Sequence, residues 1–354
     1  MKKIFCLNAS ARWMSHRAGF SLIEVLVGLG IGMVGMVVML QVFSVSEGYK
    51  RNTTGGNDAR TAGAIAMYTV QRDLRQAGYN VTLESVLGCS LTLRSGVSLN
   101  ALAPVIINPP TSTVPAGDSN TDTLLIITGN GKGPPEGDQI TLRPSTPVYQ
   151  VAAAALFRIN DYVIAVKPPE NVTRPCALTM ERVTNVTSPN VSVPIGDATK
   201  IATDWLLNLG DSPKVQAYAV RNGALTVCDY MVNNCATAST SDQNIWVPIA
   251  DNIVSMRADY AKDTNTDTIV DGYDQATPAN AASPTLWKQI IAVRMVLVAR
   301  SGQYDKAELT TTAPTWAGSS SATPIPITLS SNTDWKHYRY KEYETIVPLR
   351  NMAN

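Results

Sequence analysis

Histidine is nearly absent from this sequence of 354 residues. Only two occur, and one of them, His16, lies in a basic N-terminal segment. The other, His337, leaves no histidine pair for zinc and little material for a Ser-His-Asp relay. We therefore expect no catalytic residues and no enzymatic activity.

An excess of charge of either sign is also lacking. The chain has 29 Lys and Arg against 28 Asp and Glu. Four of the basic residues lie within residues 1–19, which hold no acidic residue, so 25 basic residues remain beyond that point against 28 acidic ones. Nucleic-acid binding needs a clustered basic face, and we expect no nucleic-acid partner.

A long apolar run stands near the N-terminus, with no charged residue between Val25 and Leu40. Extended to Phe20 and Phe43, it would form about 36 Å of helix, enough to cross a hydrocarbon core of about 30 Å. Basic residues precede the run, and none follows it before Lys50. The charge bias predicts a single-pass membrane protein with a cytoplasmic N-terminus and the rest of the chain outside.

The residues that precede this run are unlike those of an ordinary signal peptide, whose small residues follow the apolar part. Here Ala18 and Gly19 come first, in RAGFSLIEV. The segment Gly19–Val25 resembles the processing site of type IV prepilins. That resemblance implies cleavage after Gly19 by a prepilin peptidase, N-methylation of Phe20 and retention of the helix.

Glu24 is the single charge at the start of the apolar run. A carboxylate there costs several kcal/mol unless it is paired or close to the interface. After cleavage, the α-amine of Phe20 would lie four residues earlier, about 6 Å along the axis, so pairing within one chain is one interpretation. The resemblance implies another, in which Glu24 meets the amine of a neighbouring subunit and sets the register. A third is that Glu24 marks the cytoplasmic interface of a signal anchor.

Four segments follow from these patterns: a basic leader at 1–19, a transmembrane or filament-core helix at 20–45, an amphipathic continuation at 46–79 and a mainly β periplasmic domain at 80–354. Apolar residues recur at helical spacing through the third segment. We expect the paired glycines in residues 52–57 to weaken or bend the helix, and residues 77–79 to end it.

The rest of the chain predicts strands, in short Val-, Thr- and Ile-rich runs separated by turn residues. Candidate strands cover residues 122–128, 161–167, 215–220, 224–230, 252–261 and 289–300. Asn222-Gly223 predicts a tight hairpin between two of them. Residues 107–122 and 310–334 lack periodicity and predict long loops. The expected class is α+β and pilin-like: a long N-terminal helix followed by a mainly antiparallel sheet domain.

The order of motifs in the C-terminal half narrows the resemblance. The hairpin, IWVPIADNIVSMRADYAKD, WKQIIAVRMVLVARS and the terminal ETIVPLRN resemble PilW-type minor pilins. The resemblance implies a minor pilin that helps initiate or cap a type IV pilus and is found at the pilus tip after assembly. The implied partners are other minor pilins, the major pilin, prepilin peptidase, the inner-membrane assembly machinery and, before assembly, membrane lipid.

Two alternatives remain open. One is a minor pseudopilin of a type II secretion system, which would have an N-terminal segment of the same kind. The other is a signal-anchored periplasmic binding protein or enzyme, in which Glu24 is incidental.

Four cysteines lie beyond the apolar run and allow three pairings, while Cys6 lies in the leader. In an oxidising compartment disulfides are expected rather than metal ligands. Cys228 and Cys235 flank a short loop that would bring them together, which leaves Cys89 with Cys176. The alternative is that all four thiols are free.

An acidic segment near residue 270 resembles a calcium loop. Oxygen-bearing side chains occupy loop positions one, three, five, nine and twelve, namely Asp263, Asn265, Asp267, Asp271 and Asp274. Thr268 stands where such loops carry glycine, and Asp274 replaces the usual glutamate. Calcium is the one cofactor that the sequence suggests, and the alternative is an acidic solvated turn.

Overall fold

The computed structural model describes residues 19–81, 83–145, 147–279, 283–316, 325–329 and 333–351. The chain forms two compact units, Met1–Thr54 and Gly55–Asn354. Gly19 is the only residue of the predicted leader within the described ranges, so the rest of that prediction lies outside them.

One long helix, α1 (Leu22–Gln76), covers most of both predicted helical segments. The helix continues through residues 52–57, so the paired glycines do not interrupt it, although the boundary between the two units falls there. Gly78 follows the helix with φ +83° and donates its N–H to the carbonyl oxygen of Ile127 at 2.9 Å. A glycine in this left-handed conformation is a common helix terminator, which confirms the predicted stop.

The largest sheet has nine strands in the order β2-β1-β8-β7-β11-β5-β6-β10-β9. The pair β1–β8 is parallel, whereas the other pairs of this sheet are antiparallel. Its strands are β1 (Ser90–Arg94), β2 (Val97–Leu99), β5 (Asp138–Ser145), β6 (Val148–Val151), β7 (Tyr162–Val166), β8 (Ala177–Arg182), β9 (Asn185–Thr187), β10 (Asn190–Ser192) and β11 (Trp205–Gly210).

A second, antiparallel sheet has the order β14-β13-β12-β4-β3. Asn222 and Gly223 join β12 to β13 with φ values of +52° and +71°, so the predicted Asn-Gly hairpin is confirmed. The strands are β3 (Val105–Ile107), β4 (Leu124–Thr128), β12 (Lys214–Arg221), β13 (Ala224–Asp229) and β14 (Val247–Asp251).

The third sheet, also antiparallel, has the order β16-β15-β17-β20. Between β17 and β20 in sequence, β18 and β19 form a separate two-stranded antiparallel sheet. The strands are β15 (Ile253–Lys262), β16 (Gly272–Asp274), β17 (Ile290–Arg300), β18 (Thr315–Trp316), β19 (Ile325–Pro326) and β20 (Tyr340–Pro348). Short helices complete the unit: α2 (Pro284–Lys288), η1 (Ala154–Leu156), η2 (Pro169–Asn171) and η3 (Trp335–His337).

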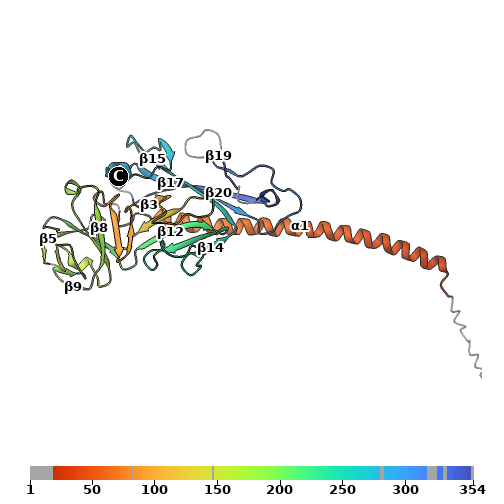
Figure 1. Cartoon of the computed structure of the whole chain (residues 1–354), viewed down its shortest axis with the longest axis horizontal. Coiled ribbons are helices and arrows are strands. Elements are labelled where there is room, and N and C mark those ends of the chain that lie inside the picture. Colours follow the sequence, from red (N-terminus) through yellow and green to blue (C-terminus); the bar gives the residue numbers. More distant parts are fainter. Residues whose placement is uncertain are drawn as a thin grey trace, which may run out of the picture. The chain divides into compact units, whose positions relative to one another are not determined.

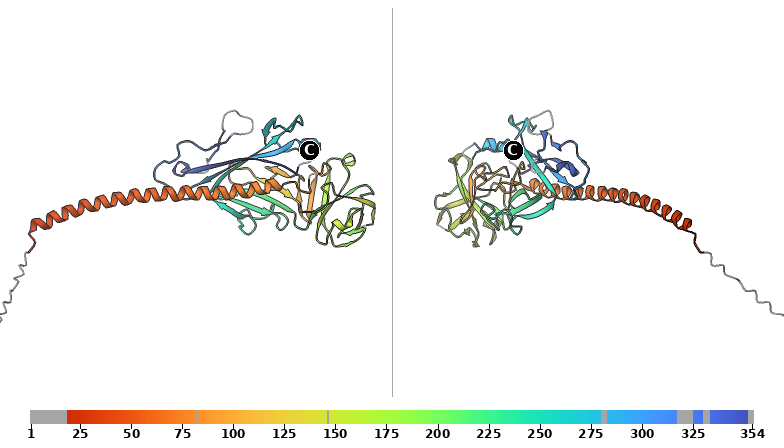
Figure 2. Two further views of the ribbon diagram at one scale, coloured as in Figure 1. Left: turned by 180° about the vertical axis from the view of Figure 1, so that it is seen from behind. Right: turned by 45° about the vertical axis from the view of Figure 1, so that its right-hand side comes forward.

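All six candidate strands from the sequence are present, with boundaries within two residues of those predicted. Within the second unit, the part of α1 from Gly55 onward runs along the strands (Figure 1, Figure 2). Its buried side chains Ala66, Val70 and Leu74 belong to the main core together with residues of all three large sheets. A long helix followed by a mainly antiparallel sheet domain confirms the predicted α+β class.

Candidate functional site

The N-terminal segment places the predicted processing residues just before α1. Gly19 and Phe20 precede the helix, and both are exposed. Ser21 and Glu24 then form reciprocal hydrogen bonds. The backbone N–H of Glu24 donates to Ser21 Oγ at 3.2 Å, and the N–H of Ser21 donates to Glu24 Oε2 at 2.9 Å. This arrangement is a capping box, which satisfies two N–H groups that have no partner within the helix.

The capping box gives Glu24 a structural role that the sequence analysis missed. The signal was present, because Ser-Leu-Ile-Glu before an apolar run matches the Ser/Thr-x-x-Glu pattern. A carboxylate at this position also interacts favourably with the positive end of the helix dipole. Glu24 is therefore directed at the start of the helix, next to the position of the predicted cleavage. Its pairing with the α-amine of a neighbouring subunit stays a prediction.

The apolar half of α1 is exposed along its length in this chain. Among the described residues, α1 is long and apolar enough to cross a membrane, and none of its most apolar window is buried. A Cβ added at Gly28, Gly30, Gly32 or Gly35 would meet nothing within 4 Å. Contacts within the chain therefore require neither these glycines nor the exposed apolar side chains, and small residues of this kind allow close approach of another helix.

The second half of α1 is fixed against the sheets by close contacts. A Cβ at Gly63 would lie 2.2 Å from Cε2 of Tyr343 and 3.0 Å from Cβ of Ala299, so glycine lets the helix approach β17 and β20. The hydroxyl of Tyr343 donates to the carbonyl oxygen of Arg60 at 2.8 Å. Gln71 donates to Thr345 Oγ1 at 3.3 Å. These contacts join α1 to the third sheet.

A buried acid joins α1 to the second sheet. Asp73 is only 3% exposed and accepts a 2.5 Å hydrogen bond from the hydroxyl of Tyr218 on β12. Arg72 pairs with the other oxygen of Asp73 at 2.8 Å, which raises the pKa of Arg72. Burial, and then the charge of Asp73, raise the pKa of Tyr218, so the phenol stays protonated and remains a donor. Asp73 is thus a fully partnered buried carboxylate, as such groups must be.

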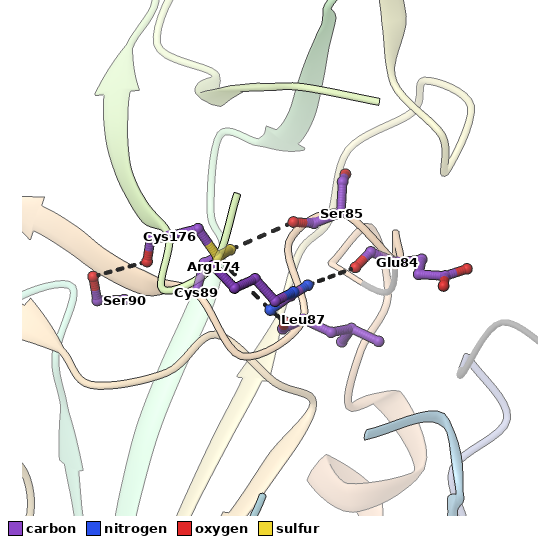
Figure 3. The surroundings of a disulfide bond; sticks show 7 residues. All are labelled: Glu84, Ser85, Leu87, Cys89, Ser90, Arg174 and Cys176. Carbon is purple, nitrogen blue, oxygen red and sulfur yellow. Dashed lines mark hydrogen bonds between the residues drawn. A yellow bond between two sulfur atoms is a disulfide. The ribbon is translucent and has the colours of Figure 1, made fainter. Parts of the chain in front are cut away.

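Both predicted disulfides are present in the second unit. Cys228–Cys235 closes a short loop after β13, whereas Cys89–Cys176 joins positions 87 residues apart, just before the parallel strands β1 and β8. Figure 3 shows Arg174 beside the second of these bonds. Its guanidinium donates to the carbonyl oxygens of Leu87 at 2.6 Å and Glu84 at 3.2 Å.

The acidic loop uses its carboxylates to hold its own backbone. Asp263 accepts from the N–H groups of Thr266 at 2.6 Å and Thr268 at 2.7 Å. Asp271 accepts from the hydroxyl of Thr264 at 2.6 Å and from its N–H at 2.7 Å, which lowers the pKa of Asp271. Further bonds within the loop involve Asn265, whose side chain donates to Asp267 and Asp271, while Asp274 pairs with Lys262 at 2.7 Å.

The calcium interpretation of this loop stays a prediction. Throughout the described ranges, no group of three or more His, Cys, Asp or Glu is placed to hold a metal ion. Because Asp263 shapes the loop, its removal would alter the loop with or without calcium. Asp267→Asn is the better test: calcium binding predicts a calcium-dependent rise in melting temperature that this variant loses, and no rise in the wild type would contradict the interpretation.

Comparison with known families gives two sequence matches. Residues 14–40 match the prokaryotic N-terminal methylation motif, which covers the Gly19–Phe20 junction and Glu24. Residues 217–351 match the family described as Type IV Pilus-assembly protein W, which covers most of β12 and continues through β20. The chain is therefore similar to the first of these families at its N-terminus and to the second over its C-terminal part.

Comparisons with whole proteins add little to these matches. The search of curated proteins found no match. A type IV-like pilin from Thermus thermophilus, among solved structures, is 11% identical, with a TM-score of 0.33, over 82% of this chain and 95% of that one. A TM-score this low supports no conclusion about fold or function.

The methylation motif, the apolar helix that follows it and the antiparallel sheet domain define a type IV pilin-like protein. Such a motif and helix fit a membrane-anchored pilin. Within that class, residues 217–351 are similar to PilW-type minor pilins.

Proposed function

We propose that this protein helps initiate assembly of, or caps, a type IV pilus, by packing its N-terminal helix among those of other pilins after cleavage between Gly19 and Phe20. Its partners in this role are other minor pilins and the major pilin. Prepilin peptidase and the inner-membrane assembly machinery act on it first. The N-terminus is cytoplasmic and the second unit periplasmic until the subunit leaves the membrane for the pilus tip.

The observation that carries this proposal is the contrast between the apolar part of α1 and the partners available to it in the chain. Large apolar side chains from Phe20 to Val45 are exposed, among them Leu22 at 80% and Met39 at 75%. Burying a Leu, Val or Met side chain contributes roughly 1.5–3 kcal/mol. Lipid before assembly, and helices of other pilins afterwards, provide that burial. Pilin partners and processing by prepilin peptidase are also what the two family matches imply.

The first experiment tests maturation. N-terminal sequencing and intact mass of the protein purified from its own cells should give a chain that begins at N-methylated Phe20. Gly19→Asp should leave the leader attached. Gly28→Ala is the matched control, because a Cβ at Gly28 meets nothing within 4 Å, and it should be cleaved normally. Cleavage beyond Phe43, no cleavage of the wild type, or normal maturation of Gly19→Asp would contradict the proposal.

The second experiment tests the role in assembly. Deletion should reduce surface pili and twitching motility, and full-length protein should restore both. The uncleaved Gly19→Asp protein should fail to restore them at equal abundance. Loss of exoprotein release with normal piliation would instead indicate a pseudopilin of a type II secretion system.

A further inference from the structure

The two disulfides differ in the exposure of their cysteine residues. Cys89, Cys228 and Cys235 are each 0% exposed. Cys176 differs from these three, because it is only partly buried at the edge of the core. Thiol–disulfide exchange requires a thiolate to reach one of the two sulfurs. Cys89–Cys176 therefore has one cysteine that is not fully buried, whereas Cys228–Cys235 has none.

A positive charge lies next to the sulfur of the partly buried cysteine. Nη1 of Arg174 is 3.7 Å from Sγ of Cys176. Figure 3 shows Arg174 beside the disulfide. The hydrogen bonds to Leu87 and Glu84 fix the guanidinium in this position. Burial lowers the pKa of Arg174 from its ordinary value of 12.5, yet an arginine stays charged at neutral pH. A cation beside a sulfur stabilises its thiolate and attracts an approaching thiolate.

A cavity gives access to this bond. Both cysteines line a space of about 210 Å³ together with Lys167 and Lys200. Lys167 is exposed, whereas Lys200 is buried and pairs with Asp197 at 3.1 Å. Among the described side chains around the disulfide, the cations Arg174, Lys167 and Lys200 outnumber the anions Asp197 and Glu84. An approaching thiolate would therefore be attracted to this cavity.

From these observations we infer that Cys89–Cys176 is the exchangeable disulfide of this protein, and that an external thiolate of the thiol–disulfide oxidoreductase class attacks it at Cys176. The attacking sulfur bonds to Cys176 Sγ while the bond to Cys89 breaks, and Cys89 leaves with the electron pair as a thiolate. Cys89 then takes a proton from solvent.

The exchange is completed by a second thiol of the same oxidoreductase. That thiol attacks the oxidoreductase sulfur that is bonded to Cys176 and releases Cys176 as a thiol. This chain thereby gains two electrons and two protons, and the two oxidoreductase thiols become a disulfide. In the reverse direction an oxidised oxidoreductase forms the bond through the Cys176 thiolate, which Arg174 stabilises. Arg174 acts as a positioning and charge-stabilising residue for this exchange.

Reduced glutathione is the probe for the test. The detergent-solubilised full chain is treated with glutathione under native conditions, free thiols are blocked with a maleimide, and peptides are analysed by mass spectrometry. We expect glutathione on Cys176 and the maleimide on Cys89, while Cys228–Cys235 stays oxidised. Glutathione on Cys89, or opening of both disulfides at one common rate, would overturn the inference.

The role of Arg174 is tested by substitution in the same assay. Arg174→Gln should slow formation of the Cys176 adduct roughly fivefold or more, and Arg174→Lys, which keeps the charge, should restore part of the rate. Arg182→Gln, at the exposed end of β8, is the matched control and should leave the rate unchanged. Equal rates for Arg174→Gln and Arg182→Gln would overturn this role. If Arg174→Gln does not fold, the site of the adduct in the wild type still decides the inference.

Discussion

The two halves of α1 obtain their stability from different sources. In residues 22–45 the side chains are mainly apolar and all exposed, and contacts within the chain leave the glycines of that stretch free. In residues 55–76 one face is buried under three sheets, and even a glycine is required by the close approach of Tyr343. A single helix thus combines a half that needs surroundings outside the chain with a half whose partners are in the chain.

This difference shows that helical sequence alone does not decide what a helix contributes to folding. Most helical stability in proteins comes from packing of one face rather than from intrinsic propensity. By this reasoning, the second half of α1 should contribute to the free energy of unfolding of the globular unit. The first half should contribute to membrane insertion and assembly, and little to that free energy of unfolding.

The largest expected effect comes from a pair of matched leucines. Leu74 is 0% exposed and Leu40 is 62% exposed, and both lie on α1. Leu74→Ala removes buried methyl groups and leaves a cavity, so it should reduce the free energy of unfolding by roughly 2–5 kcal/mol. Leu40→Ala should change it by about 0.5 kcal/mol or less. Chemical denaturation of the detergent-solubilised full chain, followed by tryptophan fluorescence, measures both.

The comparison fails if the two leucine variants lose similar stability, because the exposed half would then take part in the cooperative unit. A helix-content measurement by circular dichroism should accompany the denaturation. It separates loss of packing at Leu74 from loss of the helix itself.

A smaller effect is expected at the buried contact between α1 and β12. Tyr218→Phe removes the hydroxyl that donates to Asp73, and leaves a buried carboxylate oxygen short of one hydrogen bond. An unmade bond of this kind costs roughly 1–3 kcal/mol. The double variant with Asp73→Asn should lose less than the sum of the single variants, because the two groups interact. Additive losses in a double-mutant cycle would show that the contact contributes nothing specific.

The same contact predicts a pH dependence. Tyr218 has a pKa raised above its ordinary value of 10 by burial and by Asp73. A group whose pKa is higher in the folded state binds more protons there than in the unfolded state above pH 10, so its contribution to stability is full below pH 10 and is lost as the pH rises toward the folded value. The wild type should therefore lose stability above pH 10 more steeply than Tyr218→Phe. Parallel pH profiles in alkaline denaturation would contradict this assignment.

The sequence predicted what depends on short-range pattern. The apolar run, the glycine after Ala77, the Asn222-Gly223 hairpin and the alternating strands each follow from neighbours in the chain, and each is found in the structure. Cys228 with Cys235 is also local, since only seven residues separate them in sequence. These features required no knowledge of which strands lie side by side.

The sequence could not supply what depends on long-range order. Asp73 and Tyr218 are 145 residues apart, and the parallel pair β1–β8 joins segments more than 80 residues apart, so both need the sheet order. Arg174 beside Cys176 depends on the same arrangement for its partners Leu87 and Glu84. The Ser21–Glu24 capping box is different, because its pattern is local and was readable from the sequence.

The smallest expected effect tests that capping box, at the opposite end of α1 from Leu74. Ser21→Ala removes the acceptor for the N–H of Glu24, and losing such a cap costs roughly 1 kcal/mol locally. In the detergent-solubilised full chain the Glu24 amide should exchange its hydrogen roughly fivefold faster, since 1 kcal/mol corresponds to about that factor. Ser21→Thr should preserve slow exchange. The free energy of unfolding of the globular unit should stay the same, because local opening at one end of a helix need not reach the other. If Ser21→Ala destabilises the globular unit as Leu74→Ala does, the two halves of α1 form one cooperative element and the contrast between them is wrong.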